Sequence, residues 1–101
     1  LNNAQYIPKN YHSAHALFSI TLSSHNKREE LVGRLKKNKI PNVIYYKYPI
    51  HLMKGFHYLG YTEGDFPISE NLSQTIVSLP MHPYLCQTEI SFTIKALKKN
   101  E

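Results

Sequence analysis

The sequence predicts a small two-layer α/β domain in which three short strands alternate with three helices. One observation is size: 101 residues, of which 42% are hydrophobic and 19% charged, supply one hydrophobic core. The other is the repeated switch between alternating apolar residues, typical of strands, and apolar residues three or four positions apart, typical of helices. We therefore expect residues 1–101 to form a single domain, with residues 1–12 as an irregular lead-in.

The first predicted strand is the run from Ala14 to Leu22. Apolar side chains occupy every second position of this run, so one face of the strand would be buried. They are Ala16, Phe18, Ile20 and Leu22.

A helix is predicted next, over residues 27–38. Asn26 offers a side-chain oxygen to the free amides of a helix start, and Glu29 completes a capping-box-like pair three residues later. Leu31, Val32 and Leu35 form the apolar stripe. The opposite, solvent-facing side would carry Arg28, Arg34, Lys36 and Lys37.

Two further strands complete the predicted sheet. Residues Ile40 to Tyr46 favour extended backbone, and Pro41 is tolerable at the start or edge of a strand. The third strand is Val77 to Leu79. The pattern leaves open whether the sheet is antiparallel or mixed.

Two more helices are indicated. Asp65 is a possible cap for the first, Pro67 suits its first turn, and its apolar face would carry Ile68, Leu72 and Ile76. Thr88 can cap the last helix. In that helix we expect Ile90, Ile94 and Leu97 to face inward and Lys95, Lys98 and Lys99 to face water.

The charge balance excludes little on its own. A formal net charge of +5 permits an acidic partner. The two lysine-rich stretches alternate with core positions and accompany no nucleic-acid-binding motif, so we expect solvated helix faces and no nucleic-acid binding. No apolar run is long enough to span a membrane, and no signal peptide is visible, so a cytoplasmic location is expected.

Cysteine and histidine usage argues against several kinds of site. The single cysteine, Cys86, allows no disulfide framework, and without a recognisable base partner it is expected to be a small apolar filler. The six histidines show no metal-ligand spacing, so no metal site is expected.

The long segment from Lys47 to Asp65 has no clean period, and a loop of this length inside a small domain is usually functional. Aromatic and histidine rings, all but one with a polar tip, crowd this loop and the strand before it. Such rings either cover the sheet or stack on a sugar or base and hydrogen-bond its hydroxyls. They are Tyr45, Tyr46, Tyr48, His51, Phe56, His57, Tyr58 and Tyr61.

Specific motifs lie in and around this loop. They are the pair Tyr45-Tyr46, the proline-containing turn Pro49-Ile50-His51-Leu52-Met53, the helix start Phe66-Pro67 and the run SLPMHPYL from Ser78 to Leu85. In this order they resemble the C-terminal part of the PLP-dependent sugar-nucleotide aminotransferases of the DegT/StrS type. The resemblance extends over about Ser13 to Lys99.

The resemblance implies the small C-terminal domain of a fold-type I aminotransferase. In that family the domain packs beside a large domain and completes an active site in a homodimer. The whole enzyme transfers an amino group, usually from glutamate, to a keto sugar on a nucleotide carrier in surface-glycan or polysaccharide biosynthesis. The PLP-binding lysine and the other cofactor ligands lie in the large domain, so this chain alone is expected to hold no cofactor or catalytic residue and to be inactive.

Carried over residue by residue, the resemblance implies three substrate-binding side chains. Tyr45 and Tyr46 match the aromatic pair that reaches toward the sugar nucleotide, and His51 matches the histidine of the turn. Met53 and Lys54 depart from the family's usual Gln and Pro. For His82 we expect a structural role in the turn before the last helix. The alternative function is a non-catalytic module that binds a nucleotide sugar or docks on a partner.

Overall fold

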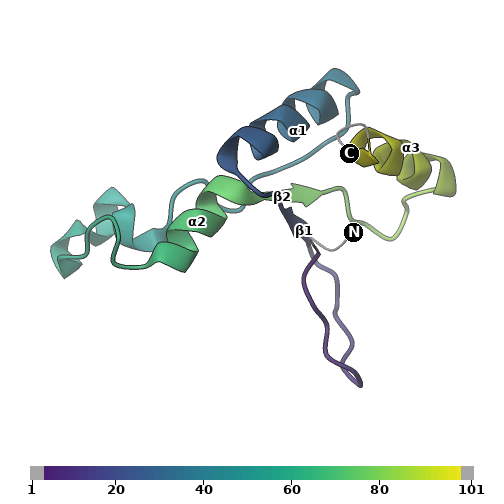
Figure 1. Cartoon of the computed structure of the whole chain (residues 1–101). Coiled ribbons are helices and arrows are strands. Elements are labelled where there is room, and N and C mark those ends of the chain that lie inside the picture. Colours follow the sequence, from purple (N-terminus) through teal and green to yellow (C-terminus); the bar gives the residue numbers. More distant parts are fainter. Residues whose placement is uncertain (1–3, 99–101) are drawn as a thin grey trace.

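A computed structural model of the chain describes residues 4–98. Figure 1 shows a small body, in which helices α1 and α3 accompany the paired strands β1 and β2, and two extensions that leave this body. We call residues 4–17 the N-terminal segment and residues 45–66 the aromatic segment. The elements are β1 (Phe18–Thr21), α1 (His25–Lys37), the 3-10 helices η1 (Ile50–Leu52) and η2 (Lys54–Leu59), α2 (Pro67–Thr75), β2 (Ile76–Leu79) and α3 (Gln87–Lys98).

The sheet has two strands in the part of the chain that the structure describes, so the prediction of a three-stranded sheet was wrong. β1 and β2 pair antiparallel, with Phe18 opposite Leu79. Of the predicted strand Ile40 to Tyr46, only Val43 pairs, through an isolated bridge to Ser78. Pro41 has no amide to donate, and the side chain of Asn42 donates to the Ile40 carbonyl instead of leaving it to a neighbouring strand.

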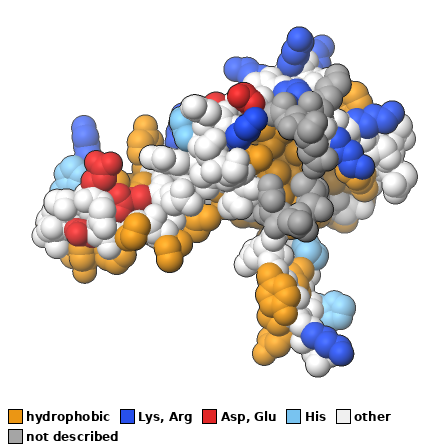
Figure 2. Space-filling view, viewed as in Figure 1, with side chains coloured by type: hydrophobic (Ala, Val, Ile, Leu, Met, Phe, Trp, Pro, Cys, Tyr) orange, Lys and Arg blue, Asp and Glu red, His pale blue; other side chains and the backbone are white. Residues whose placement is uncertain are grey.

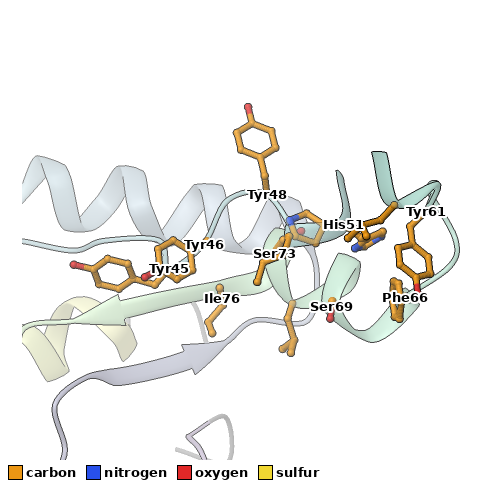
Figure 3. Close-up of a pocket in the computed structure, with 13 residues that line it drawn as sticks. Tyr45, Tyr46, Tyr48, His51, Tyr61, Phe66, Ser69, Ser73 and Ile76 are labelled. Atoms are coloured by element: carbon orange, nitrogen blue, oxygen red, sulfur yellow. The ribbon is translucent and has the colours of Figure 1, made fainter. Parts of the chain in front are cut away.

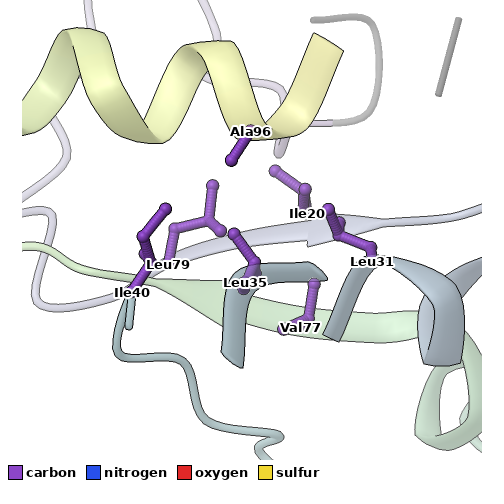
Figure 4. Close-up of a cluster of buried hydrophobic side chains, with 7 residues drawn as sticks. All are labelled: Ile20, Leu31, Leu35, Ile40, Val77, Leu79 and Ala96. Atoms are coloured by element: carbon purple, nitrogen blue, oxygen red, sulfur yellow. The ribbon is translucent and has the colours of Figure 1, made fainter. Parts of the chain in front are cut away.

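The hydrophobic core lies where α1, α3 and both strands meet (Figure 4). The predicted alternation is confirmed from Phe18 to Leu22, because Ile20 is buried and Phe18 and Leu22 pack against the core. The strand is shorter than predicted, and Ala16, which was expected on the same buried face, lies before it and is exposed. The stripe of α1 is also confirmed. The buried members are Ile20, Leu31, Leu35, Ile40, Val77, Leu79 and Ala96.

Helix α1 begins earlier than predicted. Its cap is Ser24, whose extended backbone lets Oγ accept a hydrogen bond from the Lys27 amide at 3.2 Å. Asn26 lies inside the first turn instead, so the predicted capping pair of Asn26 and Glu29 was wrong. The carboxylate of Glu29 pairs with the Arg28 guanidinium at 3.2 Å.

The two arginines of α1 are buried or half-buried, contrary to the prediction that they lie on a solvent-facing side. Arg28 is only 1% exposed, and its Nη1 donates to the Ser73 carbonyl near the end of α2 at 2.6 Å. Arg34 Nε donates to the Ala96 carbonyl near the end of α3 at 2.7 Å. Each guanidinium therefore satisfies a carbonyl near the negative end of a neighbouring helix.

The remaining helix boundaries shift by a residue or so. Phe66, not Asp65, is the residue before α2, and Asp65 instead accepts from the Thr62 amide at 2.7 Å. Ile76 opens β2 rather than ending the apolar face of α2, and Ile68 is exposed.

The last helix, α3, begins at Gln87, so Thr88 lies within it and is not its cap. Ile90 and Ile94 line an open apolar groove with Phe18 and remain more than a third exposed, while Ala96 is the buried residue of α3. Of the three side chains predicted to face inward, Leu97 packs against the core, whereas the prediction was wrong for Ile90 and Ile94, which are exposed. Lys99 lies outside the described residues.

The chain is more extended than a compact domain of its length. Its radius of gyration is 15.5 Å, against about 13 Å for a compact chain of 100 residues. The N-terminal segment contributes to this shape, because its side chains are exposed from Gln5 to Leu17. Among the described residues, none of the helices has the length and apolar character needed to cross a membrane.

Candidate functional site

A pocket with a volume of about 470 Å³ lies between the aromatic segment and α2. Figure 3 shows Tyr45 and Tyr46 at one end of this group of lining residues, near Ile76, and Tyr61 and Phe66 at the other end. Its wall on the α2 side comes from Ser69, Leu72, Ser73 and Ile76. A concave, mostly apolar surface with a few polar tips is the usual form of a small-molecule site.

All three side chains that the sequence indicated for substrate binding line this pocket. Tyr45 and Tyr46 pack edge to face, with ring centroids 5.3 Å apart, and both remain accessible. His51 lies deeper and is only 7% exposed. The structure thus brings the three residues to one surface, with the phenols at its accessible part and the imidazole at its base.

His51 faces a carboxylate that the sequence analysis did not single out. Its Nε2 lies 3.3 Å from Oε2 of Glu70, an electrostatic contact without the alignment of a hydrogen bond. Glu70 also accepts from the amides of Gly64, at 2.8 Å, and Phe66, at 3.1 Å. One carboxylate therefore joins the aromatic segment, the start of α2 and the imidazole of the pocket.

The surroundings of Glu70 favour its charged form. The Gly64 amide is the main cause that lowers the pKa of this carboxyl below its ordinary value of 4.5, and the Phe66 amide and His51 act in the same direction. Partial burial opposes them. The signal in the sequence was an acidic residue in the first turns after Pro67, where carboxylates are favoured.

Aromatic contacts complete the far end of the pocket. Phe66 lies between His51 and Tyr61, with ring centroids 4.9 Å from each and edge-to-face geometry in both pairs. Tyr48 also lines the pocket, whereas Phe56, His57 and Tyr58 do not. The crowded rings of the sequence thus divide into a group that forms the pocket and a group on its outside.

The lining of this pocket carries no lysine, arginine, aspartate or glutamate. Figure 2 shows basic side chains gathered over α1 and α3, at the other end of the molecule from the aromatic segment. Within residues 4–98, no group of three histidine, cysteine or acidic side chains is placed to hold a metal ion. The pocket can stack on rings and exchange hydrogen bonds, but it offers no paired cation for a phosphate.

Two residues outside the pocket have structural contacts. His82 Nδ1 accepts from the Tyr84 amide at 3.2 Å, which confirms its predicted role in the turn. Cys86 is exposed, so the expectation of a small apolar filler was wrong. Its thiol donates to Glu89 at 3.0 Å, and this bond is the main cause that lowers the pKa of the Glu89 carboxyl.

Comparison with known proteins identifies the family. The model of the DegT/DnrJ/EryC1/StrS aminotransferase family matches residues 2–98, which is nearly the whole chain. This chain belongs to that family. The resemblance seen in the motifs between Tyr45 and Leu85 is thereby confirmed.

Two relatives of this chain have names that specify nucleotide-sugar substrates. A dTDP-3-amino-3,4,6-trideoxy-alpha-D-glucose transaminase from Micromonospora megalomicea is 39% identical over 70 residues, which make up 68% of this chain and 19% of that protein. A UDP-N-acetyl-3-dehydro-alpha-D-glucosamine 3-aminotransferase from Acidithiobacillus ferrooxidans is 33% identical over 84 residues, 83% of this chain and 21% of that protein.

A solved family member shares the fold. The aminotransferase of this family from Brucella abortus matches with a TM-score of 0.82 and 34% identity, over 96% of this chain and 26% of that chain. The chain thus spans about a fifth to a quarter of the length of these relatives.

The family is PLP-dependent, and the pocket residues do not fit that cofactor. PLP chemistry requires a lysine that forms an imine with the cofactor aldehyde, and donors for its phosphate. No lysine or arginine lines the pocket, and its histidine faces Glu70.

Proposed function

We propose that residues 1–101 form the small C-terminal domain of an aminotransferase that acts on a keto nucleotide sugar, with glutamate as the amino donor. Support comes from the family match over residues 2–98 and from relatives whose names specify nucleotide-sugar substrates. The product would be an amino sugar for polysaccharide or surface-glycan biosynthesis, made in the cytoplasm. The chain's partners would be the large domain of the aminotransferase and a second subunit of a homodimer.

The pocket is the proposed substrate-contacting part of this domain. The observation that carries the proposal is that the adjacent Tyr45 and Tyr46 and, farther along the same segment, His51 line one pocket. The tyrosines can stack on a ring and exchange hydrogen bonds with hydroxyl groups. Because charged side chains are absent from the lining, the pocket would hold an uncharged part of the nucleotide sugar.

This chain by itself would bind no PLP and would not transaminate. The lack of a lysine among the lining residues supports this part of the proposal. Incubation with PLP followed by borohydride reduction should leave no pyridoxyl group on any lysine, as judged by mass spectrometry. Stoichiometric labelling of one lysine would contradict it.

Titration of the isotope-labelled chain with UDP-N-acetylglucosamine and with dTDP-glucose, followed by NMR, tests the pocket. We expect amide shifts concentrated at Tyr45, Tyr46 and His51. Tyr45→Phe and Tyr46→Phe should each weaken binding about 2-fold to 10-fold, because each removes one hydroxyl that can hydrogen-bond the sugar. Tyr58→Phe is the matched control, since Tyr58 is exposed and lies outside the pocket.

A non-catalytic module that docks on a partner is the second candidate function. The extended shape and the exposed N-terminal segment favour it. In this case neither nucleotide sugar would shift the pocket amides, and the tyrosine variants would behave like the wild type.

A further inference from the structure

Arg28 is a buried cation whose guanidinium contacts the backbone of residues that line the pocket. Its Nη1 donates to the carbonyls of Ser73, at 2.6 Å, and Ile76, at 3.5 Å. Ser73 and Ile76 both line the pocket, where Figure 3 labels them, whereas Arg28 does not. The guanidinium therefore reaches the site only through the backbone of residues that form it.

The carbonyls at the end of α2 need partners, because the last turn of a helix leaves them without amides of its own. The Leu22 amide donates to the Thr75 carbonyl at 2.9 Å, and His25 Nδ1 lies 3.3 Å from both the Gln74 carbonyl and Arg28 Nη2, so its tautomer decides which of the two it bonds. Arg28 satisfies the Ser73 carbonyl and places a positive charge at the negative end of this helix. Of these three partners, Arg28 alone carries a permanent charge.

Stability alone does not account for a cation in this place. A buried charge is costly unless it is well paired, and a packed apolar side chain often stabilises a core as well or better. Here the guanidinium pairs with Glu29, which is half exposed, and its Nε has no hydrogen-bond partner. What the guanidinium adds over an apolar side chain is a fixed direction for two carbonyls of the pocket wall.

We propose that Arg28 is a positioning residue that sets the shape of the substrate pocket by fixing the junction of α2 and β2. The inference rests on the proposed function insofar as it takes that pocket to bind a nucleotide sugar. It predicts that loss of the guanidinium lowers the affinity of the pocket for a nucleotide sugar. The cause would be a shift of Ser73 and Ile76, because Arg28 is not among the residues that line the pocket.

Arg34 provides a matched control in the same helix. Its Nε makes an equivalent bond, 2.7 Å long, to the Ala96 carbonyl near the end of α3. Ala96 belongs to the core and does not line the pocket. Substitution of either arginine removes one link between α1 and a helix end, but only Arg28 is linked to the pocket wall.

The test compares Arg28→Met, Arg28→Lys and Arg34→Met in NMR titrations with UDP-N-acetylglucosamine and dTDP-glucose. We expect Arg28→Met to weaken binding about 10-fold or more, Arg28→Lys to restore part of the affinity, and Arg34→Met to bind like the wild type. Lysine also has several N–H donors, but it carries them on a flexible stem and lacks the rigid planar guanidinium that fixes the direction of the two bonds. Equal affinities of Arg28→Met and Arg34→Met would overturn the proposal.

If no ligand binds, the amide chemical shifts of the ligand-free variants still test the role of Arg28. Arg28→Lys should displace the amide signals of Tyr45, Ser69 and Ser73, and Arg34→Lys should leave them in place. If the wild type binds neither sugar, the proposed function fails while this comparison still decides the role of Arg28. Unchanged signals in Arg28→Lys, or complete unfolding of Arg28→Lys where Arg34→Lys folds, would show that Arg28 does not act by positioning.

Discussion

The body of the domain and its aromatic segment differ in what holds their side chains in place. The body is stabilised by apolar burial: every fully buried hydrophobic side chain of the described residues lies in β1, β2, α1, α3 or at Ile40. Within residues 45–66, His51 is the buried residue. This segment is connected to the rest mainly by polar contacts, with Glu70 at their centre.

The difference explains where the candidate site lies. Apolar burial is non-directional and makes a body that tolerates changes on its surface. Polar contacts at an exposed loop are directional, sensitive to pH and easily rearranged, and binding sites are usually found in such less stable parts of a fold. The predictions below concern first the core and helix start of the body and then the polar contacts of the aromatic segment.

The largest effect is expected from Leu35→Ala. Leu35 is 0% exposed in the core between α1 and the strands. Truncation leaves a cavity and should lower the free energy of unfolding by about 2–5 kcal/mol, a large share of the total for a domain of this size. Chemical denaturation followed by circular dichroism measures the change.

Ile68→Ala is the control for this substitution, because it shortens a similar side chain that is 77% exposed on α2. Its effect should stay within about 0.5 kcal/mol. If both variants lost similar stability, α2 and the aromatic segment would share the core of the body. The contrast between the body and the aromatic segment would then be wrong.

A smaller effect is expected from Ser24→Ala. The Ser24 hydroxyl accepts from the Lys27 amide and caps α1, so its loss should cost about 1 kcal/mol. Asn26→Ala is the matched control, since the sequence pointed to Asn26 as the cap and the structure places it inside the helix. Thermal unfolding should show a lower midpoint only for Ser24→Ala, by about 4–8 °C. A larger loss from Asn26→Ala would restore the sequence-based assignment.

The same contrast explains what the sequence could predict. In the body, the alternation around Ile20 and the stripe of Leu31 and Leu35 gave β1 and α1, because apolar periodicity reports directly on burial. Ser24 and Asn26 are equally good caps by residue type, so only the backbone geometry decides between them.

Long-range contacts were beyond pattern analysis. Arginine is by residue type usually a surface side chain, and the burial of Arg28 depends on carbonyls 45 and 48 positions away along the chain. The segment from Ile40 to Tyr46 favours strands by residue type, but only Val43 finds a partner. The three pocket residues came from the family resemblance, whereas Glu70 and Ser73 join them only through the fold.

The smallest and most local effect is expected from Glu70→Gln. Folding lowers the pKa of Glu70 below 4.5, because the charged carboxylate accepts from the amides of Gly64 and Phe66 and faces His51. Its stabilising contribution is therefore complete above pH 4.5 and is lost as the pH falls through the lower pKa of the folded chain. The Gln variant keeps an acceptor oxygen but carries no charge to titrate.

In the wild type, the amide signals of Gly64 and Phe66 should move as the pH is lowered below 4.5, while those of Leu31 in the body stay in place. In Glu70→Gln this movement should be absent, and at neutral pH the two amides should already show weaker hydrogen bonding. Glu63→Gln, which removes an exposed carboxylate of the same loop, should behave like the wild type. If Glu70→Gln retained the acid response, another group would connect the loop to α2. If the signal of Leu31 moved together with that of Gly64, the aromatic segment and the body would unfold as one unit.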